Sequence, residues 1–404
     1  MTARQVVVTG MGAVSAAGVG WTALWEAARD GRSAIRALDF ARDYPGRIRI
    51  GAQVPDFDPA AHLDRATLLY SDPFAQYALV AADEAVREAG LTRETVGGEN
   101  CAVILGTGIG GIRTVDDGLF NIYVNRQRPE VMSVPKLIAS AGPSLLSIRF
   151  DAHGPVFAVA SACSSASQAI GMGMHMVRSG MAERAIVGGS EASLSVGTQY
   201  TWEQLRVLTP DKCRPFSKGR NGMSIGDGAG LFILETEEAA RARGAPILCR
   251  LTGYGTSADA RDAIRPDVDG ATLSMARAVK DAGIDPAAID YVNAHGTATA
   301  LNDPTEAEAM GRIFGERLAT LPVSSTKPIH GHGLGAAGAL ELVCTIAALR
   351  HGVAPPTINF LEPDPKCPVD CVPNVARKVS IRAAMSNSFA FGGINASLIV
   401  QAAA

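Results

Sequence analysis

Short runs rich in β-branched residues alternate with alanine-rich helical stretches from one end of this sequence to the other. Such alternation is typical of α/β proteins, in which helices cover the faces of a sheet. The runs that predict buried strands are residues 5–9, 101–105, 156–160, 184–187, 231–234, 247–251, 289–293 and 396–400. The clearest helical patterns between them are residues 75–89, 165–178, 270–282 and 340–349. The chain is therefore predicted to have an α/β fold.

The same signals recur in the same order in two parts of the chain. The recurring pairs are Thr-Gly-x-Gly after a strand at 9–12 and 252–255, and Gly-Thr after a strand at 106–107 and 296–297. Repeats of this kind indicate duplicated structural units. We therefore predict two similar βαβ-rich halves, residues 1–240 and 241–404. The first half is longer because it carries extra segments near 116–148 and 195–221.

Composition and patterning exclude several classes of protein. Lys plus Arg number 37 against 40 for Asp plus Glu, so the net charge is −3 and no basic surface is available for non-specific nucleic-acid binding. No apolar run approaches the ~20 residues of a membrane-spanning helix, and the first residues lack a signal-peptide pattern. Seven scattered cysteines favour reduced thiols and a cytoplasmic location. Cys367 and Cys371 have no second pair to complete a zinc site.

Cys163 is the first candidate for chemistry. It lies where a strand ends and a helix begins, within the small-residue run Ala-Ser-Ala-Cys-Ser-Ser-Ala-Ser at 160–167. A helix N-terminus favours the thiolate and is expected to lower the thiol pKa. The alternative is a buried structural cysteine, because free cysteines are among the most buried residues.

Two histidines also follow predicted strands. His295 lies in Asn-Ala-His-Gly-Thr, and His332 lies in a Gly/Ala-rich segment five residues after Lys327. A single loop histidine is most often structural. One cysteine and two histidines at strand-to-helix junctions instead favour covalent thiol catalysis, which needs nearby nitrogen bases or donors.

A diglycine segment closes the set of candidates. Residues 387–395 place Gly392 and Gly393 between apolar residues, which lets a backbone approach a ligand and offer N–H groups to an oxyanion. The alternative is a tight turn before the last strand. The glycine-rich segment 106–111 has no acidic residue placed to bind a ribose, so a nucleotide cofactor is not expected.

These motifs together resemble the β-ketoacyl-acyl-carrier-protein synthase family, the condensing enzymes of the thiolase fold. The resemblance runs from VVVTGMGAVS near the start through ACSS, CRPFSKGRNGMSIGDGAG, VNAHGTATALND and SSTKPIHGHGLGAAGALE to NSFAFGGINA near the end. The five motifs from ACSS onward, in the family's order, are far more specific than any one of them. The resemblance implies two thiolase-like halves in a five-layer αβαβα core.

The resemblance also assigns roles to individual residues. Cys163 is implied as the acyl-accepting nucleophile, with His295 and His332 completing a Cys-His-His triad, and Lys327 with Glu306 as the charged pair that fixes the histidine loop. Phe391 is implied as the gatekeeper, with Phe389 beside it, and the N–H groups of Cys163 and Phe391 as the oxyanion hole. The remaining matches are Thr297 and Thr299 to the pantetheine arm, and Asn293, Glu341, Ser386 and Asn387 to a structural monovalent cation.

The implied reaction is a decarboxylative Claisen condensation. Acyl-carrier protein delivers an acyl group on phosphopantetheine to Cys163, and malonyl-carrier protein then loses CO₂ and attacks it, with no redox or nucleotide cofactor. A homodimer is expected, pairing through residues 156–160, and a heterodimer with a paralogous subunit stays open. The alternatives are a non-catalytic partner subunit that sets chain length, which usually lacks the nucleophile, and a biosynthetic thiolase.

Departures from the family pattern bear on substrate and partner. Ala390 and Ile394 replace the usual Gly and Thr of the gatekeeper loop, and the spacing around His330 is closer to the nodulation-factor and polyene-type synthases, so a specialised pathway stays open beside a housekeeping one. The residues expected to line the acyl pocket are Ile109, Met132, Ser133 and Trp202. Those expected to meet the acidic carrier protein are Arg65, Arg126, Arg128, Lys136 and Arg214.

Overall fold

The computed structural model describes residues 4–403, so the outermost residues of the two predicted halves, 1–3 and 404, lie outside it. Its main sheet has a strand order that reads the same from both ends: β6-β5-β7-β8-β1 and then β9-β15-β14-β10-β11. The strands of the first half are β1 (Val6–Ser15), β5 (Cys101–Gly106), β6 (Val156–Val159), β7 (Arg184–Glu191) and β8 (Gly228–Thr236). Those of the second are β9 (Cys249–Ala258), β10 (Tyr291–Asn293), β11 (Val323–Ser324), β14 (Ala383–Ala390) and β15 (Ile394–Gln401).

Within the sheet formed by residues 4–403, the two halves are joined only by a short pairing between β1 and β9. β1 pairs with β9 through Val7–Arg250 and Val8–Cys249, whereas β1 pairs with β8 along its whole length. Each half therefore behaves as a five-stranded sheet, and the two are related by the mirrored strand order. The predicted α/β fold with two similar halves is confirmed.

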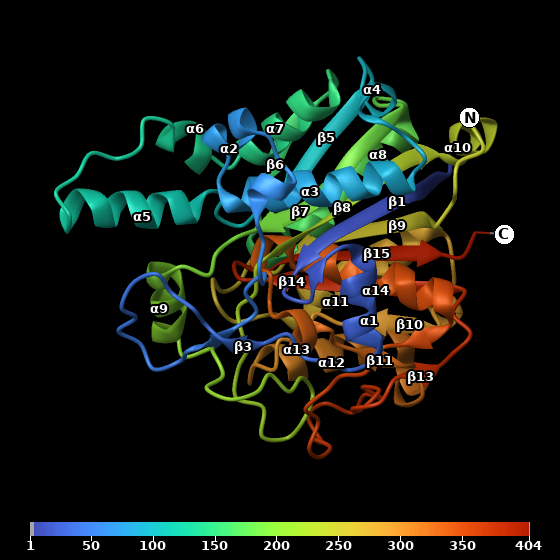
Figure 1. The fold of residues 1–404 in the computed structure, drawn as a ribbon. Helices are drawn as coiled ribbons and strands as arrows, with labels where there is room; N and C mark the ends of the chain where they lie inside the picture. Colours follow the sequence, from blue (N-terminus) through green and yellow to red (C-terminus); the bar gives the residue numbers. More distant parts are fainter. Residues whose placement is uncertain (1–3, 404) are drawn as a thin grey trace.

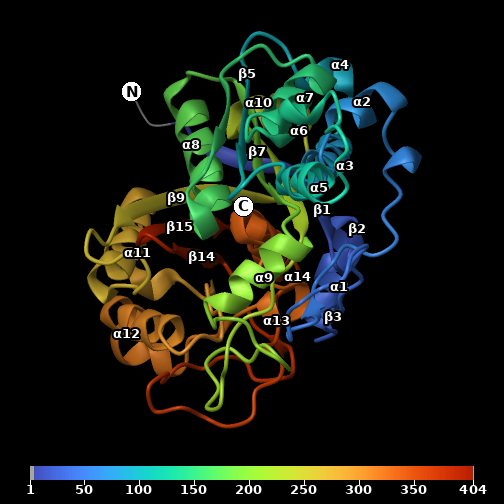
Figure 2. The ribbon, with the colours of Figure 1, turned by 90° about the vertical axis from the view of Figure 1, so that its left-hand side faces the viewer.

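Helices form three layers around these two sheets (Figures 1 and 2). The outer layers are α3 (Pro73–Glu88) with α7 (Ala141–Phe150) on the first half, and α11 (Val268–Ala282) with α12 (Asn302–Phe314) on the second. Between the sheets lie α8 (Ser165–Ser179) and α14 (Ala337–His351), which contact each other and strands of both halves. This is the αβαβα arrangement implied by the thiolase resemblance.

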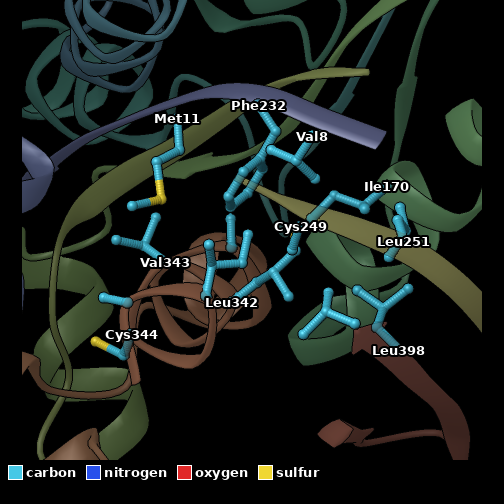
Figure 3. Close-up of a cluster of buried hydrophobic side chains, with 14 of the residues drawn as sticks. Val8, Met11, Ile170, Phe232, Cys249, Leu251, Leu342, Val343, Cys344 and Leu398 are labelled. Atoms are coloured by element: carbon cyan, nitrogen blue, oxygen red, sulfur yellow. The ribbon is translucent and has the colours of Figure 1, made fainter. Parts of the chain in front are cut away.

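The central layer contains a large cluster of buried hydrophobic side chains. Side chains from β1, β8, β9, α8, α14 and β15 meet there, among them Met11, Phe232, Leu342 and Leu398 (Figure 3). Burying each large apolar side chain stabilises the fold by about 1.5–3 kcal/mol. The segment Leu334–His351 has a mean hydropathy of 1.3, high enough for a membrane span, but 89% of it is buried inside the protein. Its apolar surface is thus already covered by the two sheets.

The two Thr-Gly-x-Gly signals lie inside strands, not in turns after them. Residues 9–12 belong to β1 and residues 252–255 to β9. The glycines are needed there because helices pack directly on the strands: a Cβ on Gly10 would lie 2.0 Å from the Ala85 carbonyl oxygen of α3. A Cβ on Gly255 would lie 2.0 Å from the Ser274 carbonyl oxygen of α11. The motif therefore marks close helix packing, at the same place in each half.

The extra segment of the first half forms an arm. Helices α5 (Ile112–Tyr123) and α6 (Ser133–Leu137) project from the body beside α2 (Arg65–Tyr70) (Figure 1). Its apolar side chains are exposed, with Tyr123 at 66% and Val131 at 89% of their full accessibility. The second insertion forms α9 (Val196–Gln204), which lies on the same side of the molecule as the arm in Figure 1.

Candidate active site

Cys163 occupies a strained turn between β6 and α8. The 3₁₀ turn Ala162–Ser164 leads directly into α8, and Ala162 adopts φ 49°, a left-handed conformation that costs about 1–3 kcal/mol for a residue other than glycine. The His332 turn repeats this arrangement, because Leu334–Ala336 leads directly into α14 and Leu334 has φ 46°. Small residues around Cys163 leave its thiol facing a cavity.

The Cys163 thiol is protonated before substrate binds. Burial raises the pKa of Cys163 to about 11, although Lys327 and a hydrogen bond from the Phe391 amide oppose that rise. The lowered pKa expected from the helix N-terminus is therefore wrong, because loss of solvent outweighs the helix end. A nucleophile in this state needs a base within reach to accept its proton.

Two buried imidazoles lie beside the thiol. His332 Nε2 is 3.1 Å from Cys163 Sγ, and the His295 ring stands edge-on to the His332 ring with centroids 5.3 Å apart. The thiol and one nitrogen of each ring lie within 4.8 Å of one another. Burial and the charge of Lys327 lower the pKa of both histidines well below the usual value. Both rings are therefore neutral at physiological pH, so His332 can accept a proton from the thiol.

Lys327 fixes which nitrogen of His295 carries the proton. Its ammonium forms a fully buried ion pair with Glu341, donates to the His295 carbonyl at 2.5 Å and lies 3.3 Å from His295 Nδ1. An ammonium has only donors, so His295 Nδ1 must accept. The neutral imidazole of His295 therefore carries its proton on Nε2, and Nε2 is the nitrogen that can donate a hydrogen bond.

The predicted Lys327–Glu306 pair is replaced by the Lys327–Glu341 pair. Glu306, on α12, instead accepts from the backbone amides of His295 and Gly296, both at 2.8 Å. Glu341 was predicted only as a cation ligand, but it is the fifth residue of α14 and pairs with Lys327. Burial raises the pKa of both Glu306 and Glu341 to about 7. Glu306 thus holds the histidine loop through the backbone and not through an ion pair.

The triad opens into a cavity of about 330 Å³. Thr297 and Thr299 line it, and their hydroxyls lie 3.0 Å apart. Phe389, Ala390 and Phe391 line the opposite wall at the end of β14. The turn from β14 to β15 needs Gly392 and Gly393, which have φ 82° and 66°. Ala390 ends a regular strand, so its extra Cβ causes no backbone strain there.

The predicted acyl-pocket residues fall into two groups. Trp202, on α9, stacks on Phe391 with ring centroids 5.8 Å apart and planes at 17°. Ile109, Met132 and Ser133 do not line the cavity around Cys163; Met132 and Ser133 belong to the arm. The prediction that Ile109, Met132 and Ser133 line the pocket at Cys163 is therefore wrong for this cavity.

The predicted carrier-protein residues also divide. Arg65, Arg126 and Arg128 are exposed, and Lys136 is paired with Glu130. Arg214 is buried at 9% exposure and paired with Asp211, so it does not fit a docking surface. Arg206 was missed: it is exposed and lines the cavity containing Cys163. It lies in the turn after α9, and no spacing in the sequence distinguishes it.

Unpartnered polar atoms gather at the predicted cation residues. Within residues 4–403, Asn293 Oδ1, Glu341 Oε2 and Ser386 Oγ are buried and have no hydrogen-bond partner. Asn293 and Ser386 are opposite each other on the paired strands β10 and β14. Asn387 differs, because its Oδ1 accepts from the Ser397 hydroxyl at 2.9 Å. Three oxygens of the predicted four residues therefore suit a monovalent cation, since hard cations prefer oxygen ligands.

Comparison with known proteins identifies the family. Residues 3–240 match the N-terminal domain of β-ketoacyl synthase and residues 248–361 its C-terminal domain. The chain is 41% identical to nodulation protein E of Rhizobium sp. (strain N33), over 98% of each chain. It is 38% identical to 3-oxoacyl-[acyl-carrier-protein] synthase 2 of Coxiella burnetii (strain RSA 493 / Nine Mile phase I), over 99% of each chain. The solved ishigamide ketosynthase/chain length factor matches with a TM-score of 0.96 and 34% identity, over 100% of each chain.

The chain therefore belongs to the β-ketoacyl synthase family. It is an acyl-transferring condensing enzyme of the β-ketoacyl-acyl-carrier-protein synthase type, which confirms the resemblance of its motifs.

The Trp202–Phe391 stack predicts a measurable control on access to Cys163. Trp202→Ala should speed alkylation of Cys163 by iodoacetamide about 2- to 10-fold, because an aromatic pair is worth about 0.5–1.5 kcal/mol and its loss frees Phe391. Trp202→Phe keeps a stacking ring and should label at close to the wild-type rate. Equal rates for the wild type and Trp202→Ala would argue that the stack does not restrain the gate.

Proposed function

We propose that this chain is a complete catalytic ketosynthase, in which Cys163 carries the growing acyl group and His295 and His332 stabilise the decarboxylation. The observation that carries the proposal is the 3.1 Å contact between Cys163 Sγ and His332 Nε2, in one cavity with His295. A non-catalytic chain-length subunit has no use for a thiol, a base and a buried lysine in this arrangement.

Acyl transfer begins with a thioester of acyl-carrier protein whose pantetheine arm lies along Thr297 and Thr299. Cys163 Sγ attacks the thioester carbonyl as its proton moves to His332 Nε2. The amides of Cys163 and Phe391 donate to the oxygen that becomes negatively charged. The bond to the pantetheine sulfur then breaks, and the leaving thiolate takes the proton from His332.

Condensation uses the same histidines in a second role. Malonyl-carrier protein enters, and its carboxylate leaves as CO₂, so the electron pair moves onto the thioester as an enolate. His295, held as a donor through Nε2 by Lys327, hydrogen-bonds the enolate oxygen. His332 donates to the same oxygen in the tautomer that carries its proton on Nε2, which its Nδ1, unpartnered among residues 4–403, allows. One such donor is typically worth about 3 kcal/mol. The enolate carbon forms a bond to the acyl-enzyme carbonyl carbon, the bond from that carbon to Cys163 Sγ breaks, and the released thiolate takes a proton from solvent.

The test is reconstitution with purified carrier proteins. Acyl-carrier proteins of varied chain length and unsaturation are mixed with malonyl-carrier protein, and the products are read by mass. Products longer by two carbons support the proposal, and turnover by no chain contradicts it. A preference for polyunsaturated chains would indicate a specialised pathway, and a preference for saturated chains a housekeeping one.

A monovalent cation among Asn293, Glu341 and Ser386 is part of the proposal. The three unpartnered oxygens support it, because a buried polar atom without a partner costs about 1–3 kcal/mol. When bound, the ion would neutralise and hold these oxygens beside the Lys327–Glu341 pair. No step of the reaction passes through it.

Potassium chloride should therefore stabilise the protein more than tetramethylammonium chloride at equal ionic strength. We expect a gain of about 1–3 kcal/mol in the free energy of unfolding at saturating ion. Ser386→Ala should remove that difference, and Ser190→Ala, which removes a hydroxyl bonded to the Phe74 carbonyl, should leave it unchanged. An identical melting curve in both salts would contradict the cation site.

Assembly and location complete the proposal. β6 is the edge of the sheet, and its apolar Val156–Val159 are only half-buried, so a second copy pairing along this edge would cover them. The same assembly would cover the apolar arm. Light scattering distinguishes a homodimer from a monomer that needs a paralogous partner. Seven free, buried cysteines support a reducing, cytoplasmic compartment.

A further inference from the structure

We propose that Glu191 is a positioning residue that ties the His332 turn to the loop after β5, and that it does so only as a carboxylate. It is fully buried at the end of β7 and takes no part in the reaction derived above. Its oxygens accept from the Gly108 amide at 2.6 Å and the Gly335 amide at 3.0 Å, and also from the Ile109 amide. Gly335 is three residues after His332.

Glu191, the loop after β5 and the turn after His332 pack so closely that neither Gly108 nor Gly335 has room for a side chain. A Cβ on Gly335 would lie 2.1 Å from the Gly108 amide nitrogen and 2.6 Å from Glu191 Oε2. A Cβ on Gly108 would lie 2.8 Å from the same carboxylate oxygen. Among the described residues, the Glu191 carboxylate is the one group that accepts hydrogen bonds from both loops, and the glycines allow it to reach both.

The mirrored fold gives Glu191 a counterpart. Glu306 accepts from two consecutive amides, His295 and Gly296, in the loop after β10, and β10 occupies in the second half the sheet position that β5 occupies in the first. Glu191 accepts from Gly108 and Ile109 in the loop after β5. In each half, a buried carboxylate thus accepts from consecutive amides of one loop. Glu191 differs from Glu306 because it also accepts from the Gly335 amide, in the turn that follows His332.

Protonation of Glu191 would weaken this tie, because a carboxylic acid has fewer acceptor sites for the amides. The added proton has the Thr107 hydroxyl, 3.3 Å from Oε1, as an acceptor, but the amide N–H groups cannot accept it. Burial raises the pKa of Glu191 to about 7. The titratable groups that face it are Asp227, which is itself paired with Arg113, and the Cys163 thiol. The tie is therefore largely formed at pH 8, and it is lost as the pH falls through about 7.

The inference rests on the proposed function and is tested by the rate of Cys163 acylation. At pH 8, Glu191→Gln should acylate about 10- to 100-fold more slowly than the wild type, because small displacements of a catalytic group cost that much. At pH 5.5 the two rates should come within about threefold of each other, because protonated glutamic acid and glutamine offer similar acceptors. Glu306 and Glu341 titrate in both proteins and cancel in the ratio.

The control is Glu84→Gln. Glu84 also binds backbone amides, of Ala13 and Trp21, but it does so under β1, away from the thiol, so its loss should leave the acylation rate close to that of the wild type at each pH. A wild type-to-Glu191→Gln ratio that stays constant with pH overturns the inference, whereas a wild type that never acylates overturns the proposed function.

Hydrogen exchange tests the same tie if Glu191→Gln does not fold. In the wild type, the Gly108 and Gly335 amides should be protected from exchange at pH 8. Their protection factors, corrected for intrinsic exchange rates, should fall about tenfold or more at pH 6. Equal protection at the two pH values would contradict a tie that needs the carboxylate.

Discussion

Cys163→Ala should abolish acyl transfer and condensation, with rates at least about 10⁴-fold below the wild type. The thiol is the only nucleophile in the described cavity placed 3.1 Å from a base, and an alanine methyl cannot form the thioester. The rate should fall equally for every acyl chain, because the substitution removes the sulfur that forms the thioester and leaves the contacts with the chain in place. The measurement is product formation from acyl- and malonyl-carrier proteins.

The same variant separates the two halves of the reaction. His295, His332 and Lys327 remain in place, so Cys163→Ala should still release CO₂ from malonyl-carrier protein. His332→Ala should lose both acyl transfer and CO₂ release. If Cys163→Ala still forms elongated product, another residue carries the acyl group and the assignment of the nucleophile is wrong.

Lys327→Met should affect stability and catalysis together. It leaves Glu341 buried without its partner, and breaking a buried pair in this way costs about 3–5 kcal/mol of the free energy of unfolding. It also removes the donor that assigns the His295 proton to Nε2. We therefore expect CO₂ release to fall about 10²- to 10³-fold, as when one oxyanion donor is lost. Chemical denaturation and a CO₂ assay measure the two effects.

The double variant Lys327→Met/Glu341→Leu distinguishes the two effects. Replacing a buried ion pair with apolar groups of similar size is often neutral or stabilising, so most of the lost stability should return. The rate of CO₂ release should not return, because His295 still lacks its donor. Recovery of activity along with stability would mean that Lys327 acts only by holding the fold together.

The sequence motifs located the reacting groups because each of these residues lies beside a glycine or small residue that its turn requires. Cys163, His295 and His332 were each predicted from such a turn, and the structure brings all three together within 4.8 Å. The duplicated fold was predicted for a related reason, since the repeated glycines mark helix packing at equivalent places in each half.

Charge partners and surface roles were harder to predict. Lys327 pairs with Glu341 and not with Glu306. Lys327 lies on α13 (Lys327–His330) and Glu341 on α14, and spacing along the chain does not reveal the contact between them. Arg214 looked like a surface cation but is buried against Asp211, while Arg206 lies at the cavity. The predicted acyl-pocket residues Met132 and Ser133 lie on the arm and not at the cavity, and nothing in the local sequence pattern indicates that placement.

Intact-mass analysis of the wild type is the decisive test that Cys163 carries the acyl group. After incubation with an acyl-carrier protein, we expect a mass increase of one acyl group, found on the peptide that contains Cys163. Malonyl-carrier protein should then remove it, with release of CO₂ and a product two carbons longer. An acyl group on any other residue, or no adduct with any chain length in the presence of active carrier proteins, would contradict the account.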